Sequence, residues 1–206
     1  MLTRKNHKSI ITMTYFAILL ALTLVVHFMI GSITIAGTNI NVVLIPISLC
    51  AMVLGPVHGA ALGFIYGAIV LIQGGVMSMD PFTSILFQNA PFMTALICIS
   101  KTTAAGFLCG TVYRLLEKKN RVAAVLVGAA ITPITNTGIF IVLCLLISKV
   151  FTENAANLGF DAAGTSLIFY LVVICAGWNF VWEFIANMIL SPVLTRVINV
   201  ISKRKI

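Results

Sequence analysis

Two charged side chains, Lys101 and Glu183, lie inside long apolar stretches of a chain that is otherwise poor in charge. A charge at the centre of a membrane costs roughly 3 kcal/mol on insertion scales, so it usually faces a pocket or a partner. A lysine donates hydrogen bonds to an anionic group, and an ionised glutamate only accepts them. The two residues therefore predict a polar site inside an apolar protein.

Amide and hydroxyl side chains accompany these charges. Asn179 precedes Glu183 by four residues, which places both on one helical face. At a rise of about 1.5 Å per residue, Lys101 lies roughly 15 Å from the start of its segment, near the membrane midplane. The binding candidates predicted at this level are Lys101, Asn136, Thr137, Trp178, Asn179 and Glu183.

Two interpretations of this group remain open. In the first, Lys101 and Glu183 form a buried ion pair that fixes helix register. Asn136 and Asn179 then satisfy the backbone or each other. In the second, Lys101 binds an anionic group of a solute, the two amides supply directional hydrogen bonds, and Trp178 forms a wall. Intramembrane ionisable residues are functional candidates by default, which favours the second interpretation.

Weaker candidates lie at the ends of the apolar segments. Asn41 begins one segment, and Gln88 and Asn89 close a connection, residues 77–90, that is rich in apolar side chains. Such a connection is typical of a lid, since mobile binding elements lie on loops over a rigid scaffold. An interfacial segment without a ligand role is the alternative for the connection, and ordinary helix capping is the alternative for the three amides.

The composition predicts an integral membrane protein. Of the 206 residues, 60% are hydrophobic and 9% are charged, whereas soluble domains average about 25% charged residues. We expect a single membrane domain over residues 1–206, built as an all-α bundle. The net charge of +8 does not indicate nucleic-acid binding, because the basic residues gather at the ends of apolar segments.

Six apolar segments are expected to cross the membrane. The last is longer than the roughly 20 residues that a span needs, so it should tilt or extend beyond the bilayer. The dipeptide Gly55-Pro56 leaves only a tight turn between the second segment and the third. The predicted segments are 10–30, 41–54, 57–76, 91–116, 122–147 and 165–198.

Basic residues predict the orientation. With the N-terminus inside, eleven Lys and Arg residues fall at cytoplasmic ends and one, Lys149, falls in an outer connection. Cytoplasmic loops carry such an excess of Lys and Arg. We therefore expect both termini in the cytoplasm and a multi-pass protein of the bacterial cytoplasmic membrane.

Signatures of enzymes and metal sites are missing from the sequence. It contains no G-x-x-x-x-G-K-[ST], H-E-x-x-H or G-x-S-x-G motif, so the usual ATP cradle and the commonest zinc-protease and serine-hydrolase sites are not predicted. The five cysteines lie in apolar stretches without metal-ligand spacing. We expect them to be small buried hydrophobic residues. We expect no enzyme activity, no metal and no cofactor.

Small residues recur at four-residue spacing in two segments: Ala17 with Ala21, and Gly59, Gly63 and Gly67. This spacing puts small side chains on one helical face, where another membrane helix can approach closely. For the glycines we favour packing within the bundle. The alanines suit either packing or an outside partner.

The order and spacing of these features resemble one transporter family. Ala17-xxx-Ala21, the run IPISLCAMVLGP at 45–56 and Gly59-xxx-Gly63 are similar to the substrate-binding S components of energy-coupling-factor (ECF) transporters. The resemblance covers about residues 10–198. It implies high-affinity capture of a vitamin from outside, and work with a transmembrane coupling subunit and two cytoplasmic ATPase subunits.

The resemblance also implies roles for particular residues. Ala17 and Ala21 would meet the coupling subunit, and residues 77–90 would be the gating lid. Three stretches, DPFTS at 80–84, GTVYRLL at 110–116 and TNTGIF at 135–140, look most like the pantothenate-type branch. Pantothenate is therefore the preferred substrate, with riboflavin and folate as alternatives.

Two rival functions remain open at this stage. A stand-alone secondary transporter would use Glu183 as its titrating group, although no internal repeat is visible and many such carriers have one. A membrane scaffold, or an enzyme of an unfamiliar type, is the other alternative.

Overall fold

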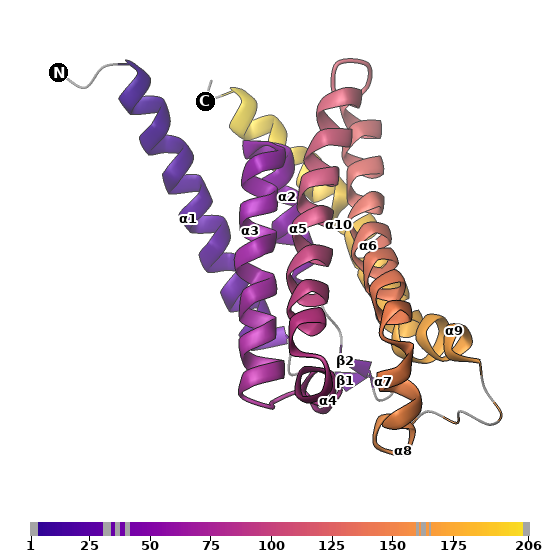
Figure 1. Cartoon of the computed structure of the whole chain (residues 1–206). Coiled ribbons are helices and arrows are strands. Elements are labelled where there is room, and N and C mark those ends of the chain that lie inside the picture. Colours follow the sequence, from indigo (N-terminus) through magenta and orange to yellow (C-terminus); the bar gives the residue numbers. More distant parts are fainter. Residues whose placement is uncertain are drawn as a thin grey trace.

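The computed structural model describes residues 4–30, 34–35, 38–39, 42–159, 161, 164 and 166–203. Within these ranges the chain is almost entirely helical, with one short antiparallel ladder that pairs Thr34 with Asn39 and Ile35 with Thr38. Figure 1 shows the elements along the chain. They are α1 (Arg4–Ile30), β1 (Thr34–Ile35), β2 (Thr38–Asn39), α2 (Leu44–Leu54), α3 (Pro56–Val70), the π-helix η1 (Leu71–Val76), α4 (Pro81–Asn89), α5 (Pro91–Leu116), α6 (Arg121–Leu146), α7 (Ser148–Glu153), α8 (Ala155–Leu158), α9 (Leu167–Phe169), the π-helix η2 (Tyr170–Cys175) and α10 (Gly177–Lys203).

Five helices in the described ranges are long and apolar enough to cross a membrane: α1, α3 continued by η1, α5, α6 and α10. The second predicted segment forms α2, which has only 11 residues and is therefore about 16 Å long. That length is about half of the roughly 30 Å hydrocarbon core. The helical membrane bundle is confirmed, and a sixth full span remains a prediction.

Glycine and proline set the boundary between α2 and α3. Gly55 has a φ of 104°, a conformation that favours glycine, and Pro56 occupies the first turn of α3, where its missing N–H is not needed. The Arg114 guanidinium lies so close to Gly55 that any side chain there would overlap it. The predicted tight turn is confirmed.

The glycine stripe of α3 packs against α5. A Cβ atom at Gly59 would lie 2.5 Å from that of Ala51 in α2, and one at Gly67 would lie 2.5 Å from the Cys98 carbonyl oxygen of α5. Between them, Thr102 Oγ1 donates a hydrogen bond of 2.6 Å to the carbonyl of Gly63. The glycines therefore serve packing inside the bundle, as predicted.

We expect Gly63→Ala to lower the stability of the bundle. The new Cβ would overlap the backbone carbonyl of Thr102, and overpacking of this kind costs roughly 1–3 kcal/mol. Thermal unfolding in detergent should show a clear fall in Tm. Gly138→Ala in α6 is the matched control, because nothing lies within 4 Å of that position. A Tm equal to that of the wild type for Gly63→Ala would contradict this account of the α3–α5 contact.

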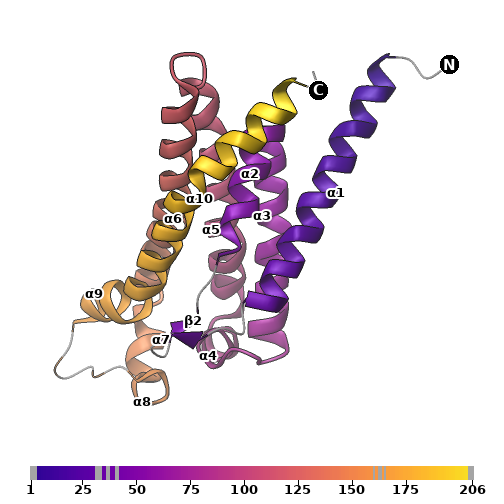
Figure 2. The ribbon, with the colours of Figure 1, turned by 180° about the vertical axis from the view of Figure 1, so that it is seen from behind.

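The first turn of α1 and the last turn of α10 lie at the same end of the bundle as the α5–α6 connection (Figures 1 and 2). The β-ladder, α4, α7 and α8 lie at the opposite end.

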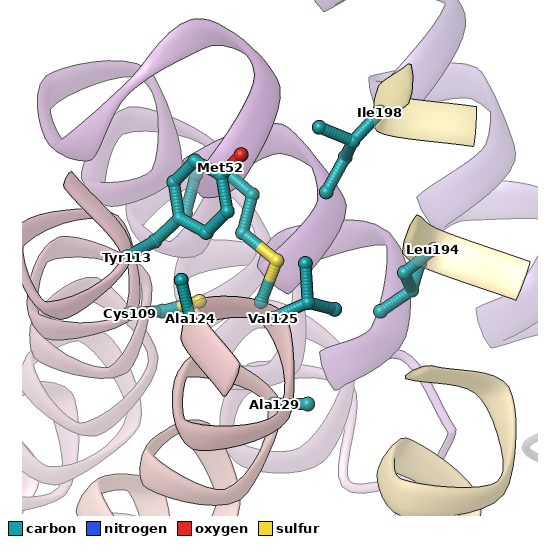
Figure 3. Close-up of a cluster of buried hydrophobic side chains, with 9 residues drawn as sticks. Met52, Cys109, Tyr113, Ala124, Val125, Ala129, Leu194 and Ile198 are labelled. Carbon is teal, nitrogen blue, oxygen red and sulfur yellow. The ribbon is translucent and has the colours of Figure 1, made fainter. Parts of the chain in front are cut away.

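An apolar cluster near the end that holds the α5–α6 connection joins α2, α5, α6 and α10, with Met52, Tyr113, Val125 and Leu194 among its members (Figure 3). A second cluster near the other end includes Leu86 and Phe151.

Helix α1 lies at the edge of the bundle (Figures 1 and 2). In its apolar window 11% of the residues are buried, against 28–39% in the other four spans. Leu19 and Thr23 face the bundle and are buried. Near the end of α1, His27 Nε2 lies 2.5 Å from Gln73 Oε1 of η1. One side of α1 is therefore free to face lipid or another protein.

The sixth predicted segment, 165–198, is not one helix. It breaks at Ala176, whose N–H donates a 2.9 Å hydrogen bond to the carbonyl of Leu171, and α10 begins only at Gly177. The chain before the break, in α9, turns away from the axis of α10 (Figures 1 and 2). The prediction of a single over-long helix was wrong, and Asn179 lies in the first turn of α10.

Candidate functional site

A cavity of about 460 Å³ lies between the helices at the end that holds α4. Its volume is within the range of about 300–1,000 Å³ that is typical of small-molecule sites. Residues from α3, α4, α5, α6, η2 and α10 line it, so the cavity collects segments that are far apart in sequence. The lining residues are Val70, Asp80, Phe82, Thr83, Leu86, Thr94, Ile97, Cys98, Lys101, Asn136, Thr137, Phe140, Tyr170, Ile174, Cys175, Ala176 and Asn179.

The structure brings four of the predicted binding residues to this cavity. Lys101 comes from α5, Asn136 and Thr137 come from α6, and Asn179 comes from α10. We call these four residues the polar wall. The Lys101 Nζ lies 5.2 Å from the centre of the Phe140 ring, an arrangement in which the ring face attracts the cation. A cation and amides from three helices thus face one space.

Glu183 lies behind the polar wall and does not line the cavity. Its side chain is 1% exposed. The Asn179 Nδ2 donates to its Oε1 at 3.1 Å, and the Asn136 Nδ2 donates to its Oε2 at 3.5 Å. Lys101 and Glu183 are both described and do not form the buried ion pair of the first interpretation; the carboxylate is held by amides instead.

The sequence also matches a known family. Residues 11–195 match the family model described as the ECF transporter, substrate-specific component. The chain belongs to this family. No curated protein gives a match to the chain. Membership implies a substrate and partners in the ECF module, namely coupling and ATPase subunits.

This S component belongs to a family of transporter subunits rather than of enzymes. Its five apolar spans fit a multi-pass membrane protein. In the part of the chain that the structure describes, no three His, Cys, Asp or Glu side chains come together as metal ligands would.

The four other predicted binding residues of the S component are Gln88, Asn89, Asn41 and Trp178. Gln88 and Asn89 are exposed on α4 and do not line the cavity. Gln88 Nε2 donates to Ser84 Oγ at 3.2 Å, and Asn89 Nδ2 donates to the carbonyl of Ile85 at 2.8 Å. Asn41 and the side chain of Trp178 lie outside the described part of the chain.

Helix α4 contributes cavity residues that the sequence analysis missed. Asp80 caps α4 by accepting from the N–H of Thr83 at 3.0 Å, and both residues line the cavity together with Phe82. The Phe82 ring lies 6.1 Å from that of Phe140 and 6.1 Å from that of Phe151. An Asp directly before a Pro is a helix-start signal, and it would have indicated a helix within the predicted lid.

A second polar cluster continues from Glu183 away from the cavity of the S component. The Asn187 Nδ2 donates to the carbonyl of Glu183 at 2.9 Å. Ser48 Oγ donates to Asn187 Oδ1 at 3.3 Å and lies 3.0 Å from Thr132 Oγ1. All these side chains are buried and none lines the cavity, so this cluster ties α2, α6 and α10 together.

Ala17 and Ala21 lie on the exposed side of α1. Large apolar side chains flank them, with Ile18 57% exposed and Leu22 43% exposed. The two alanines therefore form a shallow place on a surface that is otherwise made of bulky residues. In the described part of the chain, both alanines stay exposed.

Proposed function

We propose that this S component binds an anionic vitamin in the 460 Å³ cavity, with pantothenate as the preferred substrate. The observation that carries the proposal is the polar wall, where Lys101, Asn136, Thr137 and Asn179 face one space. A carboxylate matches the lysine, and hydroxyl and amide groups match the asparagines and the threonine. Pantothenate combines these groups in one small molecule.

Charge supports an outward-facing cavity. Arg114, Lys118, Lys119 and Arg121 lie at the end that holds the first turn of α1, and the cavity lies nearer the other end. Cytoplasmic ends of membrane proteins carry such an excess of Lys and Arg. The S component captures its substrate from outside and works with separate coupling and ATPase subunits in the cytoplasmic membrane of a bacterium.

The aromatic cluster beside the cavity supports α4 as the lid. Phe82 from α4 contacts rings from α6 and α7, and Leu86 of α4 is buried beside the cavity. Phe82 and Leu86 thus cover part of the binding space with apolar side chains. Movement of α4 would open a route for the substrate.

The substrate itself can be identified directly. We expect the purified protein, once denatured, to release pantothenate that mass spectrometry detects. Titration calorimetry should then show that pantothenate binds more tightly than riboflavin or folate. Release and tight binding of riboflavin or folate would overturn the substrate and keep the vitamin-binding role. If none of the three binds, the proposal of vitamin capture in this cavity fails.

A further inference from the structure

The carboxylate of Glu183 lies between the two asparagine amides of the polar wall. It accepts from Asn179 Nδ2 at 3.1 Å and from Asn136 Nδ2 at 3.5 Å, and it does not reach the cavity itself. We infer that Glu183 is a positioning residue, which turns the NH₂ groups of both asparagines toward itself and so makes this part of the wall selective for hydrogen-bond donors of the substrate.

The inference rests on which groups donate and which accept. An asparagine amide has an NH₂ that donates and an oxygen that accepts, whereas an ionised carboxylate only accepts. Both amides present their NH₂ groups to the Glu183 carboxyl group, at 3.1 Å from Asn179 and 3.5 Å from Asn136. The other half of each amide, its Oδ1, is left over as an acceptor.

The two leftover oxygens have no partner among the described residues. Asn136 Oδ1 and Asn179 Oδ1 are buried and make no hydrogen bond to any described residue. A buried polar atom without a partner is rare and costly. Asn136 is only 7% exposed, yet both asparagines line the cavity. Because both side chains line the cavity, a donor group of the bound substrate is the partner that the inference assigns to these two oxygens.

This arrangement favours one orientation of the substrate in the cavity. Lys101 donates and carries a positive charge, so it faces an anionic or acceptor group. The Oδ1 atoms of Asn136 and Asn179 accept, so the partners that the inference assigns to them are hydroxyl or N–H groups of the substrate. The inference depends on the proposed binding role of the cavity and deepens it, because it specifies a substrate with an anionic end and a separate donor end.

A purely structural role for Glu183 is the alternative. Its backbone carbonyl accepts from Asn187 Nδ2, and Asn187 joins the buried cluster with Ser48. In that case Glu183 would hold α10 in register, and the orientation of the two amides would not influence which ligand binds. The two roles predict different ligand preferences.

Amide orientation can be measured in the wild-type protein without any ligand. Solid-state NMR with ¹³C-glutamate and ¹⁵N-asparagine should show strong dipolar coupling between the Glu183 carboxyl carbon and the Nδ2 atoms of both Asn136 and Asn179. Asn136→Ser and Asn179→Ser assign the two couplings, because each removes one of them. If either amide turns its oxygen toward Glu183 instead, its coupling is weak and the inference is overturned.

Binding to matched ligands tests the consequence. The probes are pantothenate and its analogue in which the secondary hydroxyl is oxidised to a ketone, which accepts hydrogen bonds but does not donate them. The glutamine of Glu183→Gln presents both an NH₂ and an oxygen. One of the two asparagine amides must therefore turn its oxygen toward position 183. We expect this variant to bind pantothenate about tenfold more weakly and to shift the hydroxyl-to-ketone preference about tenfold toward the ketone.

Asn187→Ser is the control, since Asn187 lies one turn from Glu183 and outside the cavity lining. It should leave the hydroxyl-to-ketone ratio unchanged. Equal weakening of both ligands by Glu183→Gln would overturn the inference in favour of the structural role. If the wild type binds no pantothenate, the proposed substrate fails, and the NMR couplings still decide the orientation of the amides.

Discussion

Lys101→Met should weaken pantothenate binding by about 2–5 kcal/mol, which is about thirtyfold to several thousandfold in Kd. Methionine keeps an unbranched side chain and removes the charge. The loss is large because the lysine faces a cavity inside the apolar bundle, where water replaces a lost ionic contact poorly. Titration calorimetry on the purified protein measures the change.

An uncharged ligand shows whether the lysine acts on the carboxylate. The alcohol analogue of pantothenate, in which the carboxylate is reduced to a hydroxymethyl group, should bind wild type and Lys101→Met with nearly equal affinity. Lys149→Ala is the control for general loss of charge, because Lys149 is exposed on α7, away from the cavity lining. An unchanged Kd for pantothenate in Lys101→Met would remove Lys101 from the site.

The lysine is well placed for this role because it lines the cavity and forms no ion pair with any described residue. Its Nζ lies over the Phe140 ring, and the Glu183 carboxylate is held by Asn136 and Asn179. The sequence alone left a buried ion pair and a ligand contact as alternatives. These two alternatives differ in the directions of side chains that lie on separate helices. The spacing of residues within one helix does not determine those directions.

Helix ends were predictable where local chemistry decides them. The fourth predicted segment, 91–116, coincides with α5, which begins at Pro91. Asn120 caps α6 by accepting from the N–H of Ala123 at 3.1 Å, as a helix-capping side chain does. The break at Ala176 was missed because the hydrophobic stretch continues through it.

The polar wall was predictable because polar residues are scarce in apolar segments, so each one is conspicuous. Residues of α4 were not, because Phe82 and Leu86 look the same in sequence whether they cover a cavity or face lipid. Their position follows from the aromatic cluster with Phe140 and Phe151. Gln88 and Asn89 attracted attention as polar residues but are exposed, with hydrogen bonds inside their own helix.

Ala17→Trp and Ala21→Trp should abolish uptake while vitamin binding stays within about threefold of wild type. Both alanines are exposed on α1, away from the cavity lining, so the new rings leave the site intact. They fill the shallow place between Ile18 and Leu22, where small residues would let a helix of the coupling subunit approach closely. Uptake in cells that contain the whole transporter, and calorimetry on the isolated S component, measure the two effects separately.

Ile134→Trp gives the matched comparison, because Ile134 is 47% exposed on α6, far from α1 across the bundle (Figure 1). It adds a similar ring to another apolar surface and should keep both uptake and binding. If uptake falls equally in all three variants, bulk at the surface disturbs the protein in general. If Ala17→Trp and Ala21→Trp lose binding together with uptake, the substitutions damage the bundle, and the exposed side of α1 is not a docking surface for the coupling subunit.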